Sequence, residues 1–202
     1  RSIALPGGGE IAAGGERGLR LVSRGGAAPR LVATPDPWVE SVAVLDGQLW
    51  VATAAGAASG PFDAASLAAV PRGADATAGV AWNGAFRFVP ADGPPRVSAL
   101  LGDGSRRETP APERFFRLFI ASGQLFADGP SGLRRFDPAR GFVLSREAPP
   151  ALPEPHVNCL ASDGARLFLG FFDGGIAVAD PRGSPLAATV LPSGDAWGVN
   201  AL

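Results

Sequence analysis

Several residue types that carry chemistry are rare or absent in this 202-residue chain. Cys159 is the only cysteine, so no disulfide can form within the chain, and a single thiol on a predicted strand is most simply a small buried residue. His156 is the only histidine, which excludes a histidine-based metal cluster. The longest uncharged run, 47–62, is too short and too rich in small residues to span a membrane. The sequence therefore predicts no metal, no cofactor and no membrane insertion by this segment.

An excess of charge of either sign is also lacking. The chain has 18 basic and 19 acidic residues, and all of the basic ones are arginine. A balanced surface has no general attraction to a phosphate backbone or to anionic lipid. We therefore expect no nucleic-acid partner.

Glycine, proline and apolar residues are abundant instead. The chain has 28 glycines and 20 prolines, yet 46% of its residues are hydrophobic. That apolar content allows enough burial to offset the entropy lost on ordering, which argues against disorder. Many turn residues between short apolar runs favour an all-β fold. The best helix candidate, 63–70, is long enough for only one or two turns.

Glycine anchors recur along the chain with a period of about forty residues. One set precedes a predicted second strand, with separations of 39, 37, 39 and 41 residues: Gly8, Gly47, Gly84, Gly123 and Gly164. Another precedes a predicted third strand, with separations of 38, 37, 39 and 43 residues: Gly18, Gly56, Gly93, Gly132 and Gly175. Asn83-Gly84 and Asp163-Gly164 predict tight hairpins, because type I′ turns need positive φ at both central residues. The separations in the two sets vary in parallel along the chain, which indicates a real repeat.

Four short strands in each unit of this length predict a β-propeller, whose blades bury their faces against one another. We expect one domain over 1–202 with about five four-stranded blades. The predicted units are 1–37, 38–77, 78–114, 115–155 and 156–197. The third unit has the weakest pattern, because Arg87 and Pro90 interrupt its second strand.

The C-terminal residues repeat the start of the fifth unit. Residues 197–202, WGVNAL, copy the segment 156–160 and then stop, so 198–202 predict a strand that begins a further blade or closes the first one. Both alternatives remain open from the sequence alone.

The fifth unit resembles a known repeat. Residues 157–176 read V-N-x-L-x-x-D-G-x-x-L-F-L-G-x-x-x-G-G-I, and 46–53 read D-G-Q-L-W-V-A-T. This pattern resembles the two-component regulator propeller repeat, in which V-N-x-L leads to D-G-x-L-W-I-G-T and then to G-G-L. The resemblance implies a bacterial, extracytoplasmic propeller that senses or scaffolds, often as the input part of a signalling protein. The motif residues are structural in that family, so no active site is implied.

A ring of side chains before the first strand of each unit is the candidate ligand site. Its members are Trp38, Phe115, His156 and Trp197. In a propeller these positions would lie near one mouth of the central channel, where stacking groups could hold a carbohydrate or another small ligand. The alternative, which we favour, is that they are wedges between adjacent blades.

A catalytic set is not evident. Glu40 is the only carboxylate within a predicted innermost strand, whereas glycosidases use a pair. His156, Ser162 and Asp163 lack the G-x-S-x-G elbow of a hydrolase. The pairs Arg106-Arg107 and Arg134-Arg135 are predicted to be solvated. The leading hypothesis is a non-enzymatic propeller that binds a ligand or a protein partner. The alternatives are a lectin-like propeller and a propeller glycoside hydrolase or lyase.

Overall fold

The chain is all-β, as its repeat predicts. The computed structural model describes residues 2–7, 9–45, 47–53, 55–70, 76–90, 93–101, 103–144, 154, 156–183 and 186–191. Trp197 and the predicted extra strand at 198–202 lie outside the described residues. The chain divides into two compact units, Arg1–Pro110 (unit 1) and Ala111–Leu202 (unit 2).

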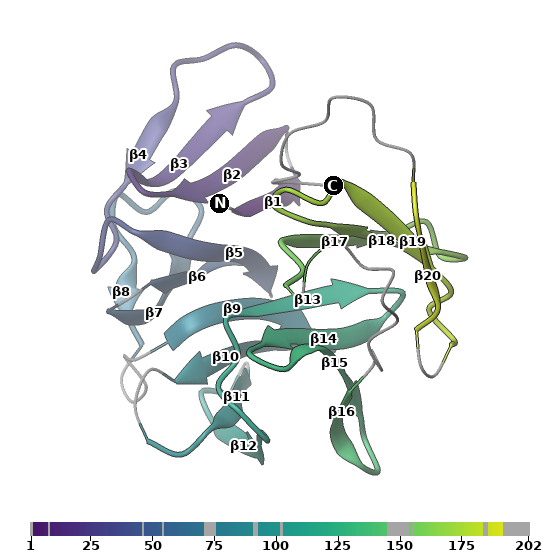
Figure 1. Cartoon of the computed structure of the whole chain (residues 1–202). Helices are drawn as coiled ribbons and strands as arrows, with labels where there is room; N and C mark the ends of the chain where they lie inside the picture. The colour runs from purple at the N-terminus through teal and green to yellow at the C-terminus, as the bar shows by residue number, and fades with distance from the viewer. Residues whose placement is uncertain are drawn as a thin grey trace. The chain divides into compact units, whose positions relative to one another are not determined.

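Unit 1 contains three four-stranded antiparallel sheets, which we number as blades 1 to 3 (Figure 1). Blade 1 consists of β1 (Ser2–Gly7), β2 (Glu10–Gly15), β3 (Gly18–Ser23) and β4 (Arg30–Val32). Blade 2 consists of β5 (Val39–Leu45), β6 (Gln48–Thr53), β7 (Gly56–Pro61) and β8 (Ala68–Ala69). Blade 3 consists of β9 (Ala76–Trp82), β10 (Ala85–Pro90), β11 (Arg96–Leu101) and β12 (Arg106–Pro110).

Unit 2 contains two more sheets of the same kind. Blade 4 consists of β13 (Arg117–Ala121), β14 (Gln124–Gly129), β15 (Gly132–Asp137) and β16 (Gly141–Leu144). Blade 5 consists of β17 (Cys159–Ser162), β18 (Leu167–Gly170), β19 (Ile176–Ala179) and β20 (Ala188–Val190). In all five sheets each strand pairs with the next one in the chain. Five such meander sheets are the blades of a β-propeller, which confirms the predicted fold class.

The hairpin turns have the geometry that their sequences require. Asn83 and Gly84 have φ of 47° and 70°, and Ser122 and Gly123 have φ of 48° and 68°. Both pairs form two-residue turns, since Trp82 pairs with Ala85 and Ala121 with Gln124. Positive φ at both positions is the type I′ signature, whose twist matches that of the flanking strands. The anchors Gly84 and Gly123 are therefore turn residues.

The hairpin of blade 5 is longer than predicted. Ser162 pairs with Leu167, so Asp163-Gly164 begins a four-residue loop and is not a two-residue turn. The Asp163 carboxylate accepts backbone N–H bonds from Ala165 and Arg166 at 3.0 and 2.7 Å. The side chain thus provides acceptors for backbone N–H groups of the loop, which in a tight turn would bond to backbone carbonyls.

The helix candidate at 63–70 is not helical, and the predicted interruption of the second strand at Arg87 is wrong. Residues 63–70 form no helix, because the Ala65 carbonyl and the Leu67 N–H bond to Ala33 of blade 1 and are not available to a helical turn. Strand β10 runs through Arg87 to Pro90, but its pairing with β9 is irregular between Val89 and Pro90. Arg87 is accommodated by stacking its guanidinium over the Trp82 ring, 4.9 Å from the centroid, and Pro90 is the last residue of the strand.

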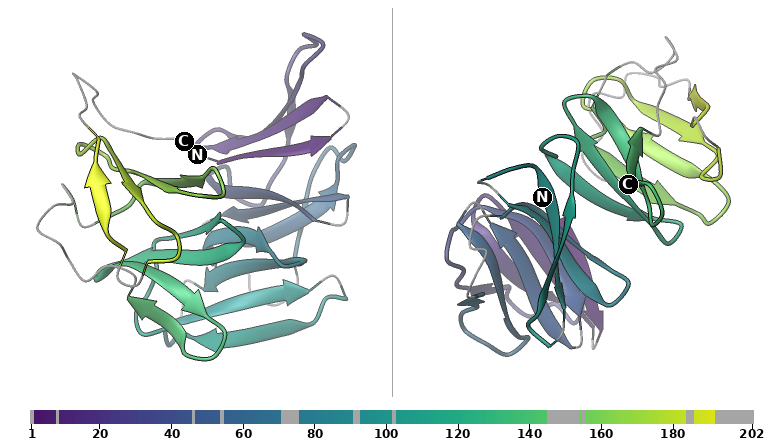
Figure 2. Two further views of the ribbon diagram at one scale, coloured as in Figure 1. Left: turned by 90° about the vertical axis from the view of Figure 1, so that its right-hand side faces the viewer. Right: turned by 90° about the horizontal axis from the view of Figure 1, so that it is seen from below.

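The sheets within each unit bury their faces against one another. In unit 1, Leu21 of blade 1 belongs to a buried cluster with Val42 of blade 2, and Trp50 of blade 2 belongs to another with Phe86 of blade 3. Figure 2 shows the blue and teal sheets of this unit lying face to face. In unit 2, blades 4 and 5 share the cluster that contains Phe126. Burial against a neighbour is what stabilises sheets that could not cover both faces alone.

Candidate functional site

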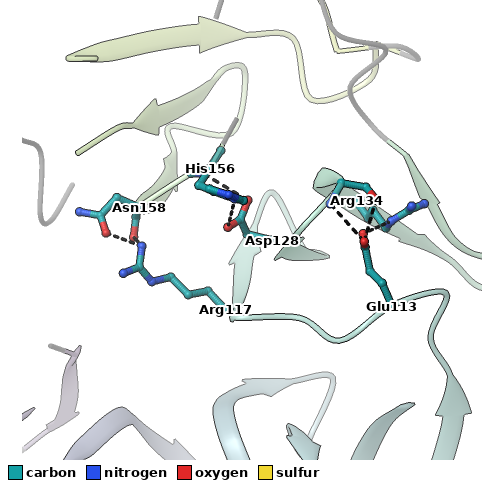
Figure 3. Close-up of polar contacts among 8 residues, drawn as sticks. Glu113, Arg117, Asp128, Arg134, His156 and Asn158 are labelled. Atoms are coloured by element: carbon teal, nitrogen blue, oxygen red, sulfur yellow. Dashed lines mark hydrogen bonds and ion pairs between the residues drawn. The ribbon is translucent and has the colours of Figure 1, made fainter. Parts of the chain in front are cut away.

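Asp128 lies at the junction of the two blades of unit 2 and is the centre of a polar cluster (Figure 3). It is 1% exposed, and among the described residues it is the one charged side chain that is buried. Its Oδ1 accepts the backbone N–H of Val157 at 3.2 Å, and its Oδ2 lies 3.5 Å from His156 Nδ1. A carboxylate of blade 4 therefore binds the segment that leads into blade 5.

Burial controls the protonation of this carboxyl. Removal from water raises the pKa of Asp128, because a low dielectric disfavours the charged form. The Val157 N–H and the nearby His156 and Arg117 lower the pKa in turn, but they do not cancel the effect of burial. His156, which is one of these opposing groups, has a side chain that is 46% exposed and lies 3.5 Å from Oδ2.

Arg117 extends the cluster towards blade 5. It is the register partner of Asp128, so the two side chains lie on the same face of blade 4. Its guanidinium donates to the Asn158 carbonyl at 3.2 Å and also to the Asn158 side-chain oxygen, as Figure 3 shows. The junction of blades 4 and 5 thus combines a buried carboxylate with a charged hydrogen-bond donor at its rim.

Exposed rings lie at the same end of these blades. Phe116 is 51% exposed and meets the His156 ring edge-on, with the centroids 5.6 Å apart. Phe172 is 60% exposed and directly follows Phe171, after the end of β18. In an antiparallel meander the start of the first strand and the end of the second strand share one end of the sheet. We call the exposed rings of Phe116, His156 and Phe172 the ring surface of unit 2.

A second carboxylate at this end is engaged in structural contacts. Glu113 accepts hydrogen bonds from Arg134 Nε at 2.8 Å and from the Ser131 hydroxyl and N–H at 2.7 and 3.1 Å. Burial raises the pKa of Glu113, but the bonds from Arg134 and Ser131 outweigh it and lower the pKa. Arg134 was predicted to be solvated, yet it is half-buried in this ion pair.

The predicted ring of residues is placed unevenly. Trp38 is 48% exposed and His156 is also exposed, whereas Phe115 is only 1% exposed and packs on Phe142 with centroids 4.8 Å apart. Trp197 lies outside the described residues. The ligand-binding role of these residues stays a prediction.

The backbone pairing explains why Phe115 differs. The Phe116 N–H donates to the Asp128 carbonyl at 2.7 Å, as the Asn158 N–H donates to the Gly170 carbonyl at 2.8 Å. Phe115 therefore corresponds to the buried Val157, and the residue of blade 4 that corresponds to His156 is the exposed Arg114. The sequence analysis placed Phe115 and His156 at the same position of their units, which was wrong by one residue.

Sequence reasoning missed Asp128 itself. The residue follows the run Leu125-Phe126-Ala127, and by register it occupies the place that Gly170 has in blade 5. Blade 4 thus has a charged residue where the buried strand of blade 5 has glycine. A residue-by-residue comparison of the units could have found this difference.

The likeness of this chain to known proteins lies in its fold. No family model and no curated protein matches it. Among solved structures it is similar to streptogramin B lyase, with a TM-score of 0.70 and 16% identity over 95% of this chain and 68% of that one. It is also similar to the extracellular domain of BT4673 from B. thetaiotaomicron, described as a one component or hybrid two component system, with a TM-score of 0.68 and 16% identity over 88% of this chain. A chain of a nidogen/laminin complex has a TM-score of 0.66 and 14% identity, covering 93% and 78% of the two chains.

These similarities define the fold and not an activity. The protein is a β-propeller, and its structural neighbours include both an enzyme and the extracellular domain of a signalling protein. The chain spans 26% of the length of the BT4673 chain. Within the described ranges, no helix is long and apolar enough to cross a membrane, and no three potential ligands among His, Cys, Asp and Glu are grouped to hold a metal.

Proposed function

We propose that this chain is a non-enzymatic propeller that binds a ligand or a protein partner, as the extracytoplasmic sensing part of a bacterial signalling protein. The repeat pattern of 157–176 supports the signalling context, since it resembles the two-component regulator propeller repeat. The likeness to the extracellular domain of BT4673 supports the same context at the level of the fold. Rigid blades with variable loops at their ends suit recognition.

One observation carries the proposal against an enzyme. The carboxylates at the candidate site are committed to structural hydrogen bonds, Asp128 to Val157 and Glu113 to Arg134 and Ser131, while the rings beside them are exposed. A glycosidase needs two carboxyl groups facing a substrate, one of them able to donate a proton. Exposed rings of Phe and His are instead typical of recognition surfaces.

A test of catalysis separates the two classes. We expect no turnover when the protein is incubated with aryl glycosides or with a streptogramin B antibiotic, the substrate named for the structural neighbour. The readouts are release of the aryl group and mass spectrometry of the antibiotic. Turnover that disappears in Asp128→Asn would contradict the proposal and would assign the chain to the enzymes.

A test of binding uses the ring surface. Partner proteins and glycan arrays are screened with the intact chain, and any binder is retested with Phe116→Ala. Arg140→Ala is the matched control, because Arg140 is exposed in the turn at the other end of blade 4. We expect binding to weaken about tenfold with Phe116→Ala and to stay unchanged with the control. A binder that both variants retain would place recognition elsewhere.

A lectin-like role is the second candidate, favoured by the exposed ring of Phe116 at the edge of His156. An aromatic face stacks on the apolar face of a sugar ring. Titration with mono- and oligosaccharides, followed by intrinsic fluorescence and by backbone NMR shifts near Phe116, tests it. A flat response to all of them excludes this candidate and leaves the protein-binding role.

A further inference from the structure

Arg87 of blade 3 differs from the other half-buried arginines among the described residues, because no acceptor meets it. The others form an ion pair with a carboxylate or donate to a backbone carbonyl: Arg30, Arg96, Arg106, Arg134 and Arg135. The Nε–H of Arg87 is buried and has no hydrogen-bond partner in the described part of the chain. A buried donor without an acceptor is rare in folded proteins, so it points to a partner from outside the chain.

Trp82 holds the head of Arg87 but does not take its hydrogen bonds. Trp82 pairs with Ala85, two residues before Arg87, so both side chains lie on one face of blade 3. The guanidinium carbon of Arg87 lies 4.9 Å from the centroid of the Trp82 ring. Stacking occupies the flat face of a guanidinium, whereas its N–H groups point outwards in the plane. The donors of Arg87 are therefore held in position for an acceptor.

Arg107 brings a second positive charge to the same face. Arg87 pairs with Ala99, and Ala99 pairs with Arg107, so the three side chains form one row across the sheet. The two arginines start two strand spacings apart, about 9.6 Å, and Ala99 between them has only a methyl group. Burial and then the charge of Arg107 lower the pKa of Arg87, which shows that the two cations interact. We call Arg87 and Arg107 the arginine pair.

The acids that are nearest in the chain do not neutralise the arginine pair. Glu108 points to the other face of blade 3, where it forms ion pairs with Arg96 and Arg106 at 3.2 and 3.4 Å. The Asp103 carboxylate accepts the backbone N–H of Ser105 at 2.8 Å. Within the described ranges, no carboxylate forms an ion pair with either member of the arginine pair. Two interacting cations thus share one face without a counter-charge.

We propose that the arginine pair binds a doubly charged phosphate group, either as inorganic phosphate or as a phosphate monoester. Two guanidinium groups balance the two charges of a phosphate, whereas a single carboxylate would leave one cation uncompensated. The Nε–H of Arg87 donates to one phosphate oxygen, and Arg107, which is exposed, contacts the phosphate from the solvent side.

The site goes beyond the proposed function, since it uses no residue of the ring surface. It also agrees with the balanced charge of the chain. A site for one phosphate releases few counterions, so it gives no general affinity for polyanions.

The test measures binding of inorganic phosphate to the whole chain by NMR, through the indole N–H of Trp82, which is identified by its loss in Trp82→Phe. At about pH 7.5 most of the phosphate is a dianion. We expect a saturable shift with a Kd on the order of 1 mM, and binding of acetate that is about tenfold weaker. Arg107→Ala should weaken phosphate binding about tenfold. Arg140→Ala removes the same charge from an exposed turn of unit 2 and should leave the Kd unchanged.

Each arm of the test can overturn the proposal. No saturable shift up to about 50 mM phosphate, beyond that of sodium chloride at the same ionic strength, would do so. Equal affinity for acetate and phosphate, or equal Kd values for Arg107→Ala and Arg140→Ala, would also do so. Arg107→Glu, another change at an exposed position, should abolish binding.

The source of the phosphate group follows from a comparison of two probes. Tighter binding of phenyl phosphate than of inorganic phosphate would identify a monoester, and the reverse would identify free phosphate. The Phe116→Ala test of the proposed function concerns another unit, so the two results are distinguishable.

Discussion

Asp128 shows how one residue can join two repeats. Its carboxylate is buried and accepts the N–H of Val157, the first buried residue of blade 5. Leaving a buried N–H without an acceptor destabilises the folded state by about 1–3 kcal/mol, because the group has lost its hydrogen bonds to water. Burial also disfavours the charged form of this carboxylate. The net contribution of Asp128 to stability is therefore found by comparison with a neutral side chain that can accept the same bond.

Substitution of Asp128 separates these two effects. Asp128→Ala should lower the free energy of unfolding by about 1–3 kcal/mol, because Val157 N–H then has no acceptor. Asp128→Asn should retain most of the stability, because the amide oxygen can still accept that bond. Urea denaturation at pH 7 measures both through the midpoint at unchanged slope. Equal losses in the two variants would show that the charge, and not the acceptor, matters.

The pH dependence of stability tests the raised pKa of Asp128. Because the folded state holds the proton more tightly than the unfolded state, the contribution of this group is fully present below its ordinary pKa of 3.8 and is lost as pH rises through the folded pKa. The stability of the wild-type protein minus that of Asp128→Asn should therefore fall from pH 3.8 upwards and then level off. Denaturation at a series of pH values gives this difference. A difference that rises with pH would show that His156 and Arg117 dominate.

At the scale of the strand and turn, glycine serves two purposes in this chain. Gly84 has φ of +70° in a hairpin turn, and a Cβ added there would have no neighbouring heavy atom within 4 Å. Gly79 lies on β9, where a Cβ would be 2.4 Å from the ring of Phe86 and 2.9 Å from the Cβ of Ala52 in blade 2. Gly84 is needed for its positive φ, whereas Gly79 is needed because the lack of a Cβ allows two blades to pack closely.

These two roles predict opposite rankings for two substitutions. At Gly84, asparagine should be tolerated better than alanine, since Asn adopts the left-handed region more readily and Ala there costs about 1–2 kcal/mol. At Gly79, asparagine should be worse than alanine, because the larger side chain clashes more and overpacking already costs about 1–3 kcal/mol. Thermal unfolding of the four variants measures the order. The same order at both sites would contradict the distinction.

The ring surface also belongs to this scale, because it depends on how the repeats differ. Blade 4 has Arg114 where blade 5 has His156. The shared positions determine the fold, and the unshared ones provide the candidate sites.

At the scale of the whole molecule, the balanced charge of the chain limits its partners. With a formal net charge of −1 at pH 7, the protein should have no general affinity for polyanions. We expect it to pass through a heparin column at about 0.15 M salt and to leave duplex DNA unshifted in a gel assay. Cytochrome c, a basic protein, is a suitable positive control. Retention on heparin would reveal a basic surface that the net charge conceals.

The fold class was predictable because its signals are local. Glycine at positive φ is required by the turn itself, and alternating apolar residues are required by any half-buried strand, so both appear in the sequence at the period of the blade. Asn83-Gly84 illustrates this, since two adjacent residues specify the turn type without reference to the rest of the chain. The sequence by itself therefore predicted an all-β fold of about five four-stranded sheets.

The sites were decided only by the tertiary structure, because they depend on pairing between distant segments. Whether Phe115 or Arg114 corresponds to His156 is settled by backbone hydrogen bonds to β14 and β18, which composition does not encode. Asp128 acquires its role from Val157, a residue of the segment that leads into the next blade. A change of one residue in register moves a side chain from the core to the surface, so such contacts cannot be inferred from a pattern alone.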